Sequence, residues 1–305
     1  MSDDTPTIAV LGLGAMGLPM ATHLATAFPV TGFEPHAPRR DQARHSGIAV
    51  AESPAEAGAA ADIVLLAVRD QEQAHATLFG PDGILQTLAG GSPIILTSTV
   101  GPDVARDLAE KLGATGHPLV DAPISGGPVR AGRGDLLIVV GADGAALEST
   151  RPVLEHLAAT LVIVGPHPGD GQALKTINQL LAGIHIAAAA EAIALARALH
   201  LDLDVVLDAL SSGAAGSFMF ADRGPRMVEA YNGGAAVKSR VDIFVKDMGI
   251  VTTAGRAAHV PLPLAAAAEQ LYLIAEAAGL GAADDSAVVT ILSPDGSRQP
   301  TGSMG

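Results

Sequence analysis

One lysine stands out because its sequence neighbours are mostly apolar. Residues 169–181 read GDGQALKTINQLL, and Lys175 lies at the start of a stretch rich in alanine and leucine. The chain has lysines only at positions 111, 175, 238 and 246, and arginine supplies most of its positive charge. Burial or a nearby cation can bring a lysine toward neutrality, whereas arginine stays charged. Lys175 therefore indicates acid/base chemistry, with a solvated helix lysine as the alternative.

Other polar residues accompany this lysine. Asn178 follows it by three residues, so the two share one face of a helix, where an ammonium and an amide can hold and protonate one oxygen. His185 lies near the same stripe, where we expect a packed, hydrogen-bonded histidine. Lys246 and Asp247 are neighbours in FVKDMG, and their simplest interpretation is a surface ion pair.

A serine and two glycines follow a strand-like run in HPLVDAPISGGPVRAGRG. Ser125, Gly126 and Gly127 would expose backbone N–H groups beside a hydroxyl, an arrangement that binds anions such as a carboxylate. The segment thus predicts a substrate-carboxylate site. A turn with only a structural role is the alternative.

A glycine-rich loop follows the first strand-like run. In GLGAMG the first glycine makes the tight turn, the second lets the backbone approach a pyrophosphate, and the third lets helix and strand pack closely. Because the loop follows an apolar strand and opens a helix, it predicts dinucleotide binding. The predicted cofactor-binding residues here are Gly12, Leu13, Gly14, Ala15, Met16 and Gly17.

An acidic residue ends the next strand-like run, PVTGFE, about twenty residues after the loop. The carboxylate of Glu34 can accept hydrogen bonds from the adenosine ribose and would repel a 2′-phosphate. It therefore predicts NAD as cofactor, with NADP second. Arg39 and Arg40 could neutralise a phosphate if they fold back, although a solvated helix face is the simpler interpretation.

The pattern of elements changes part-way along the chain. From Thr7 to about Gly165 apolar runs alternate with helical patterns, which is typical of βαβ units in an α/β domain with a doubly wound parallel sheet. After the hinge GPHPGDG the pattern is helical. We expect a cofactor domain over residues 1–168, an all-α substrate and dimerisation domain over 169–292 that begins with a long helix, and a disordered tail over 293–305.

Composition narrows the function classes. The chain of 305 residues has no cysteine, which excludes disulfides and thiolate chemistry. Its formal charge of -14 argues against nucleic-acid partners and against anionic membranes. The longest apolar stretch, LLAGIHIAAAAEAIALA, is interrupted by a histidine and a glutamate, and the N-terminus lacks the features of a signal peptide. We expect a cytoplasmic protein without a membrane span.

Five stretches together resemble the β-hydroxyacid dehydrogenase family, in their order and rough spacing, from Thr7 to about Leu292. They read GLGAMGLPMA, STVGP, DAPISGGPVRAG, GQALKTINQLL and FVKDMG. The resemblance implies a Rossmann domain joined by a long helix to a helical domain, with the active site in the cleft between them. It also implies these roles: Lys175 for catalysis; Ser125, Gly126, Gly127 and Asn178 for the substrate; Thr99 and Lys246 for the cofactor.

The resemblance also suggests a reaction. The tract NQLLAGIHIAAAAEAIALA, and VDIFVKDMGIV followed by PLPLA, are most similar to the members that act on L-threonate, so we expect NAD-dependent oxidation of a small hydroxy acid without a metal. Many members have two asparagines after the lysine, whereas Asn178 is followed by Gln179, which leaves the substrate open. Alternatives are a 2-hydroxy-3-oxopropionate reductase, a 3-hydroxyisobutyrate dehydrogenase, or a dinucleotide-binding sensor. The apolar helical domain predicts a homodimer or homotetramer.

Overall fold

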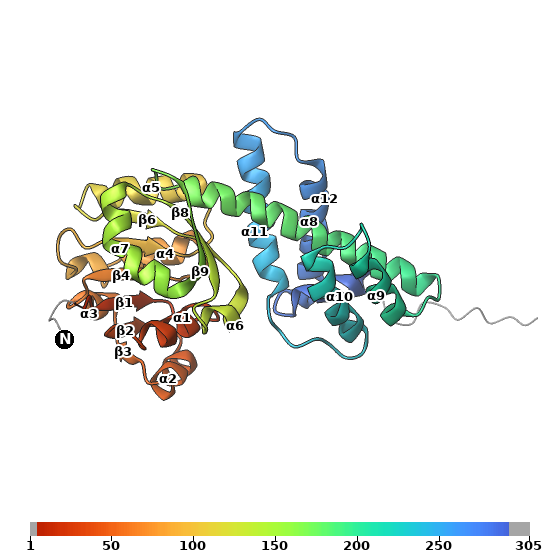
Figure 1. Ribbon diagram of the computed structural model, residues 1–305, viewed down its shortest axis with the longest axis horizontal. Coiled ribbons are helices and arrows are strands. Elements are labelled where there is room, and N and C mark those ends of the chain that lie inside the picture. The colour runs from red at the N-terminus through yellow and green to blue at the C-terminus, as the bar shows by residue number, and fades with distance from the viewer. Residues whose placement is uncertain (1–4, 293–305) are drawn as a thin grey trace, which may run out of the picture. The chain divides into compact units, whose positions relative to one another are not determined.

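The computed structural model describes residues 5–292. The chain divides into two compact units, of which the first extends to Thr176 and the second starts at Ile177. This division lies within the long helix α8 (Asp170–Ala198), green in Figure 1, whereas the predicted boundary near residue 168 lies just before that helix. The predicted tail, residues 293–305, lies outside the described residues.

The first unit is built on one mixed sheet (Figure 1). Strands β3, β2, β1, β4, β5 and β6 run parallel in that spatial order, which is the strand order of a Rossmann fold. Strand β8 extends the sheet, antiparallel to β6 and β7 and parallel to β9. The strands are β1 (Ile8–Leu11), β2 (Val30–Phe33), β3 (Ala49–Ala51), β4 (Ile63–Leu66), β5 (Ile94–Leu96), β6 (Leu119–Asp121), β7 (Ile124–Ser125), β8 (Leu136–Gly141) and β9 (Ala158–Gly165).

Helices cover both faces of this sheet. Alternate residues of β1 belong to different core clusters: Ile8 packs in the cluster that contains Leu24 of α1, whereas Leu11 packs in the one that contains Leu108 of α5. Because side chains alternate along a strand, each cluster occupies one face. The helices are α1 (Gly17–Leu24), α2 (Ala37–His45), α3 (Pro54–Gly58), α4 (Gln71–Phe79), α5 (Pro102–Gly113), α6 (Gly127–Ala131) and α7 (Gly144–Leu157), with a single turn, η1 (Ile84–Gln86).

The carboxyl ends of the parallel strands form one aligned edge. Leu11 pairs with Phe33 on one side and with Leu66 on the other, Leu66 pairs with Leu96, and Leu96 pairs with Asp121. The segments that follow these residues therefore emerge side by side. In open α/β sheets ligands bind outside this edge, where the strand order reverses.

The second unit is helical, as the sequence predicts. It comprises the rest of α8 with α9 (Leu203–Ser212), α10 (Phe218–Tyr231), α11 (Val241–Ala257), α12 (Pro263–Ala275), α13 (Val288–Leu292) and the short segments η2 (Glu276–Leu280) and η3 (Asp285–Ala287). Among the described helices, α8 alone is long and apolar enough to cross a membrane. However, 56% of its most apolar window is buried inside the protein. Ile186, Ala190 and Ile193 are fully buried in the core of this unit.

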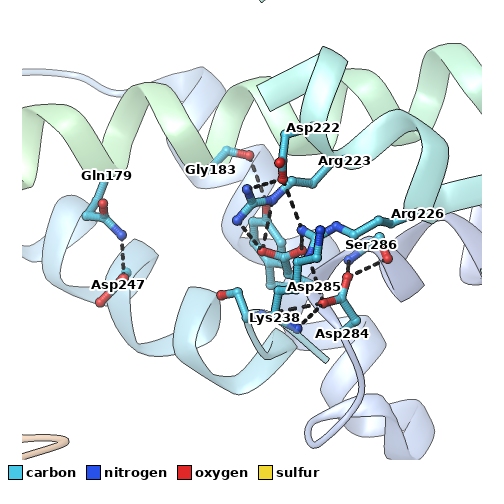
Figure 2. Close-up of polar contacts among 12 residues, drawn as sticks. Gln179, Gly183, Asp222, Arg223, Arg226, Lys238, Asp247, Asp284, Asp285 and Ser286 are labelled. Carbon is cyan, nitrogen blue, oxygen red and sulfur yellow. Dashed lines mark hydrogen bonds and ion pairs between the residues drawn. The ribbon is translucent and has the colours of Figure 1, made fainter. Parts of the chain in front are cut away.

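A buried set of charges ties α10 to η3 in the second unit (Figure 2). The guanidinium of Arg226 lies 3.0 Å from carboxylate oxygens of both Asp284 and Asp285, and Arg223 lies 3.0 Å from Asp285. Asp285 is completely buried. Each charge has an opposite partner, which is the condition for holding charges in an apolar core.

Candidate active site

In the glycine loop, close backbone packing requires glycine at two positions, Gly12 and Gly17, but not at the third, Gly14. Gly12 has φ +94°, and a Cβ there would lie 2.5 Å from the carbonyl oxygen of Ala67. A Cβ on Gly17 would lie 1.8 Å from the carbonyl oxygen of Gly12. At Gly14 the nearest atom would be the guanidinium of Arg39, at 3.5 Å. The open face at Gly14, beside the N-terminus of α1, fits the approach of a pyrophosphate.

Glu34 braces this loop from the end of β2. Its side chain is 4% exposed, and its Oε2 atom accepts a hydrogen bond of 3.0 Å from the N–H of Leu13. Its Oε1 atom accepts one of 3.1 Å from the N–H of His36. An ionised carboxylate has about four acceptor sites, so Glu34 retains capacity for ribose hydroxyls.

Arg39 and Arg40 both fold back toward the end of β2. Arg40 donates hydrogen bonds of 3.1 and 2.9 Å to the carbonyl oxygens of Glu34 and Pro35. The guanidinium of Arg39 lies 4.0 Å from the carboxylate of Glu34, and its side chain is 50% exposed. The interpretation as a solvated helix face is therefore wrong for Arg40, whereas Arg39 is half exposed and lies close to Glu34.

The predicted carboxylate site has the backbone shape expected of it. Ser125 ends β7, where it pairs with Leu137 of β8, and its side chain is half-buried. Gly126 and Gly127 follow with φ values of +146° and +74° and lead into α6. No atom lies within 4 Å of where a Cβ of Gly127 would be, so its conformation, and not crowding, favours glycine.

Lys175 lies in the second turn of α8 and is only 8% exposed. It is therefore not a solvated surface lysine. An amine with so little exposure loses part of its hydration.

The start of α8 is anchored by two residues that the sequence analysis did not single out. The Oδ2 atom of Asp121 accepts hydrogen bonds from the N–H groups of Gly169 and Gln172, at 2.8 and 2.9 Å. The side-chain amide of Gln172 donates a further one of 3.0 Å to Oδ1 of Asp121. Two signals were present in the sequence: an acidic residue at the end of the apolar strand, and a glutamine one helical turn before Lys175.

The carboxyl of Asp121 is completely buried, and burial raises its pKa to about 6, although hydrogen bonds from Gln172 and Gly169 lower it. Since this exceeds the ordinary value of 3.8, the group contributes most to stability below pH 3.8, and the contribution is lost as the pH rises through about 6. At neutral pH the ionised carboxylate is thus held at a cost to stability.

In the second unit a chain of polar contacts joins α8 to α11. Asn178 donates a hydrogen bond of 2.9 Å to Gln179. Gln179 in turn donates one to Asp247, as Figure 2 shows. Asp247 also lies 2.8 Å from the Nζ atom of Lys246. Asp247 is only 3% exposed, so this ion pair is not the expected surface pair. Glutamine at position 179 therefore has a structural role, because its side-chain amide donates a hydrogen bond to Asp247.

The structure brings some predicted residues together within each unit. In the first, Leu13 of the glycine loop contacts Glu34, and Thr99 lies in the loop that Gln172 holds. In the second, Asn178 is connected to Lys246 through Gln179 and Asp247. The roles of Lys175, Thr99 and Lys246 toward their ligands stay predictions.

Comparison with known proteins finds one family model for each of two parts of the chain. Residues 7–165 match the family described as the NAD-binding domain of 6-phosphogluconate dehydrogenase. Residues 169–292 match the family described as the NAD-binding domain of NADP-dependent 3-hydroxyisobutyrate dehydrogenase. The L-threonate dehydrogenase of Cupriavidus necator is 40% identical over 290 residues, which cover 93% of this chain and 95% of that protein.

Two solved structures also match nearly the whole chain. The crystal structure of a 3-hydroxyisobutyrate dehydrogenase from Salmonella typhimurium matches with a TM-score of 0.86 and 35% identity, covering 93% of this chain and 99% of that one. A 3-hydroxyisobutyrate dehydrogenase from Mycobacterium tuberculosis with L-serine matches with a TM-score of 0.82 and 30% identity, covering 95% and 99%. The chain belongs to the β-hydroxyacid dehydrogenase family. This β-hydroxyacid dehydrogenase is an NAD(P)-dependent oxidoreductase, and the sensor alternative is set aside.

The different roles of two glycines give a first prediction. Gly14→Ala should fold normally but bind NAD(H) at least about tenfold more weakly, because the methyl group fills the space where the pyrophosphate approaches. Gly17→Ala should lower the melting temperature as well, because its Cβ collides with Gly12. Calorimetry for NAD(H) affinity and thermal unfolding check both. Normal NAD(H) affinity in Gly14→Ala would contradict the assigned space.

Proposed function

We propose that this β-hydroxyacid dehydrogenase oxidises a small polyhydroxy acid with NAD, and that its substrate is L-threonate, which gives 2-oxo-tetronate. The observation that carries the proposal is the place of Lys175. This nearly buried lysine lies one helical turn beyond Gln172. Gln172 is hydrogen-bonded to the ends of β5 and β6, and these ends belong to the sheet edge that also carries the glycine loop. The resemblance to L-threonate dehydrogenases supports the substrate.

The residues would act on separate parts of the substrate. The hydroxyl of Ser125 and the N–H groups of Gly126 and Gly127 bind its carboxylate. NAD, when bound, supplies the hydride acceptor for the carbinol carbon. The neutral amine of Lys175 accepts the proton of the carbinol hydroxyl as the C–H bond breaks and the C=O bond forms, and in the reverse reaction the ammonium returns it. Asn178 orients the substrate from the next turn of α8.

A substrate panel tests the proposal. We expect NADH formation, followed by absorbance, to be fastest with L-threonate among L-threonate, D-glycerate, 3-hydroxyisobutyrate and L-serine. Faster turnover of 3-hydroxyisobutyrate, or of D-glycerate, would assign the enzyme to 3-hydroxyisobutyrate dehydrogenase or to 2-hydroxy-3-oxopropionate reductase. Both alternatives use the same predicted lysine, so the panel separates substrates and leaves the chemistry unchanged.

Replacing Lys175 tests the proton transfer. Lys175→Arg keeps the positive charge but cannot become neutral, so both Lys175→Arg and Lys175→Ala should lose about 100-fold or more in kcat, with NAD affinity retained. Steady-state kinetics and NAD titration measure this. Lys111→Arg, at a lysine paired with Asp107 on the surface of α5, is the matched control and should leave kcat unchanged. Near-normal turnover in Lys175→Arg would mean that charge alone suffices.

We infer NAD as the preferred cofactor from Glu34, and its test is the ratio of kcat/KM for NAD to that for NADP. Glu34→Gln keeps the size of the side chain but removes the charge that repels a 2′-phosphate, so the ratio should fall about tenfold or more. Arg39→Ala should move the ratio the other way, since it removes a cation near the same place. Equal or better use of NADP by the unmodified enzyme would overturn the inference.

We also infer a homodimer or homotetramer that works in the cytoplasm. Large apolar side chains lie exposed on the second unit, among them Phe218 at 76%, Leu195 at 61% and Leu199 at 60%. Leu195 lies in the last turn of α8, and Leu199 follows the end of the helix with its N–H bonded to the carbonyl oxygen of Leu195, so the two lie close together. Covering them with a second copy would remove apolar area from water.

A further inference from the structure

The side-chain amide of Gln172 makes four hydrogen bonds inside the first unit. Its Oε1 atom accepts from the N–H groups of Val100 and Gly101, at 3.0 and 3.1 Å. Its Nε2 atom donates to the carbonyl oxygen of Ser98 and to Asp121, at 2.9 and 3.0 Å. An amide has two donors and an acceptor with two lone pairs, so this set uses its full capacity. Gln172 is completely buried, which leaves no water to replace a lost bond.

These bonds connect three segments of the proposed site. The contacts to Ser98 and Val100 lie on either side of Thr99, which is predicted to lie against the cofactor. The contact to Asp121 lies at the end of β6, four residues before Ser125. Gln172 itself lies three residues before Lys175 on α8. One side chain therefore bonds the segment around Thr99 and the strand end that precedes Ser125, and it lies one helical turn before Lys175.

The backbone of Gln172 is held as firmly as its side chain. Asp121 accepts the N–H of Gln172 and that of Gly169, so a carboxylate from a strand end caps the N-terminus of α8. A Cβ on Gly171 would lie 2.8 Å from the carbonyl oxygen of Val139 and 2.9 Å from that of Asp121. The first turn of the helix thus lies directly against β6 and β8 and has little room to shift.

We propose that Gln172, together with Asp121, is the positioning residue of this active site: it locks the first turn of α8 to the loop that carries Thr99 and so sets where Lys175 presents its amine. The inference rests on the proposed role of Lys175. Lys175 follows by three residues, about 4.5 Å along the helix axis, so a shift of the first turn is carried to it. A misplacement of about 1 Å can cost a hundredfold in rate.

The stability lost by burying the carboxylate of Asp121 agrees with a positioning role for Asp121 and Gln172. Burial raises the pKa of Asp121, so the ionised group lowers stability at neutral pH. An apolar pair would fill the same volume without that cost, but it could not cap α8 and bind the backbone around Thr99 at once.

The test is Gln172→Met, which keeps the length of the side chain and removes all four hydrogen bonds. We expect kcat to fall about 100-fold, with a much smaller change in KM for the acid. In a Lys175→Ala background the same substitution should change the residual kcat by less than about twofold, because the group it positions is gone. An equal loss in both backgrounds would overturn the proposal, since Gln172 would then act independently of Lys175.

A second readout does not depend on the substrate. With only four lysines in the chain, ε-¹³C-lysine labelling gives few NMR signals, which Lys→Arg variants assign. Gln172→Met should change the shift and the titration midpoint of Lys175 and leave Lys111 and Lys238 as they are. If no hydroxy acid is oxidised, the proposed function fails while this readout still reports on positioning. An unchanged Lys175 signal would overturn the inference even in an active enzyme.

Two further variants guard against trivial outcomes. Thr150→Val removes hydrogen bonds from a completely buried hydroxyl on α7, so it should lower stability while kcat and the Lys175 signal stay unchanged. If Gln172→Met does not fold, Gln172→Asn, which keeps an amide that is one methylene too short, replaces it in both readouts. A normal Lys175 signal and normal kcat in folded Gln172→Asn would overturn the proposal.

Discussion

The contact between the carboxylate of Asp121 and the first turn of α8 is the interaction on which the placement of Lys175 depends. A helix begins with N–H groups that have no partner within the helix, and here a buried carboxylate from a strand end accepts two of them. The same carboxylate accepts from Gln172, whose amide extends the contact to the loop after β5. The lysine proposed as general acid/base is thereby held in a fixed position relative to the sheet.

The glycine loop shows how one short stretch separates folding from binding. Gly12 and Gly17 are required because their own chain approaches too closely for a side chain, whereas a Cβ at Gly14 would meet only the guanidinium of Arg39, at 3.5 Å. Glu34 braces the N–H of Leu13, and it is also the residue proposed to accept hydrogen bonds from the ribose hydroxyls. The proposed cofactor preference and the stability of the loop thus involve the same carboxylate.

The second unit departs from the family pattern in a way that the contacts explain. Gln179 replaces the second asparagine found in many members, and it is buried against Asp247, which also pairs with Lys246. Position 179 thus belongs to the packing between α8 and α11. Asn178 is half-buried beside it and remains the residue of this pair proposed to orient the substrate.

The sequence by itself determined the α/β and all-α halves, the dinucleotide loop with Glu34, and the candidate lysine, because these follow from local periodicity and short motifs. Only the tertiary structure decided that Lys175 is buried, that Arg39 and Arg40 fold back onto β2, and that Asp121 and Gln172 hold the start of α8. Asp121 and Gln172 are 51 residues apart. Such contacts arise from strand order and helix packing, and a sequence read locally carries no signal for which distant groups will meet.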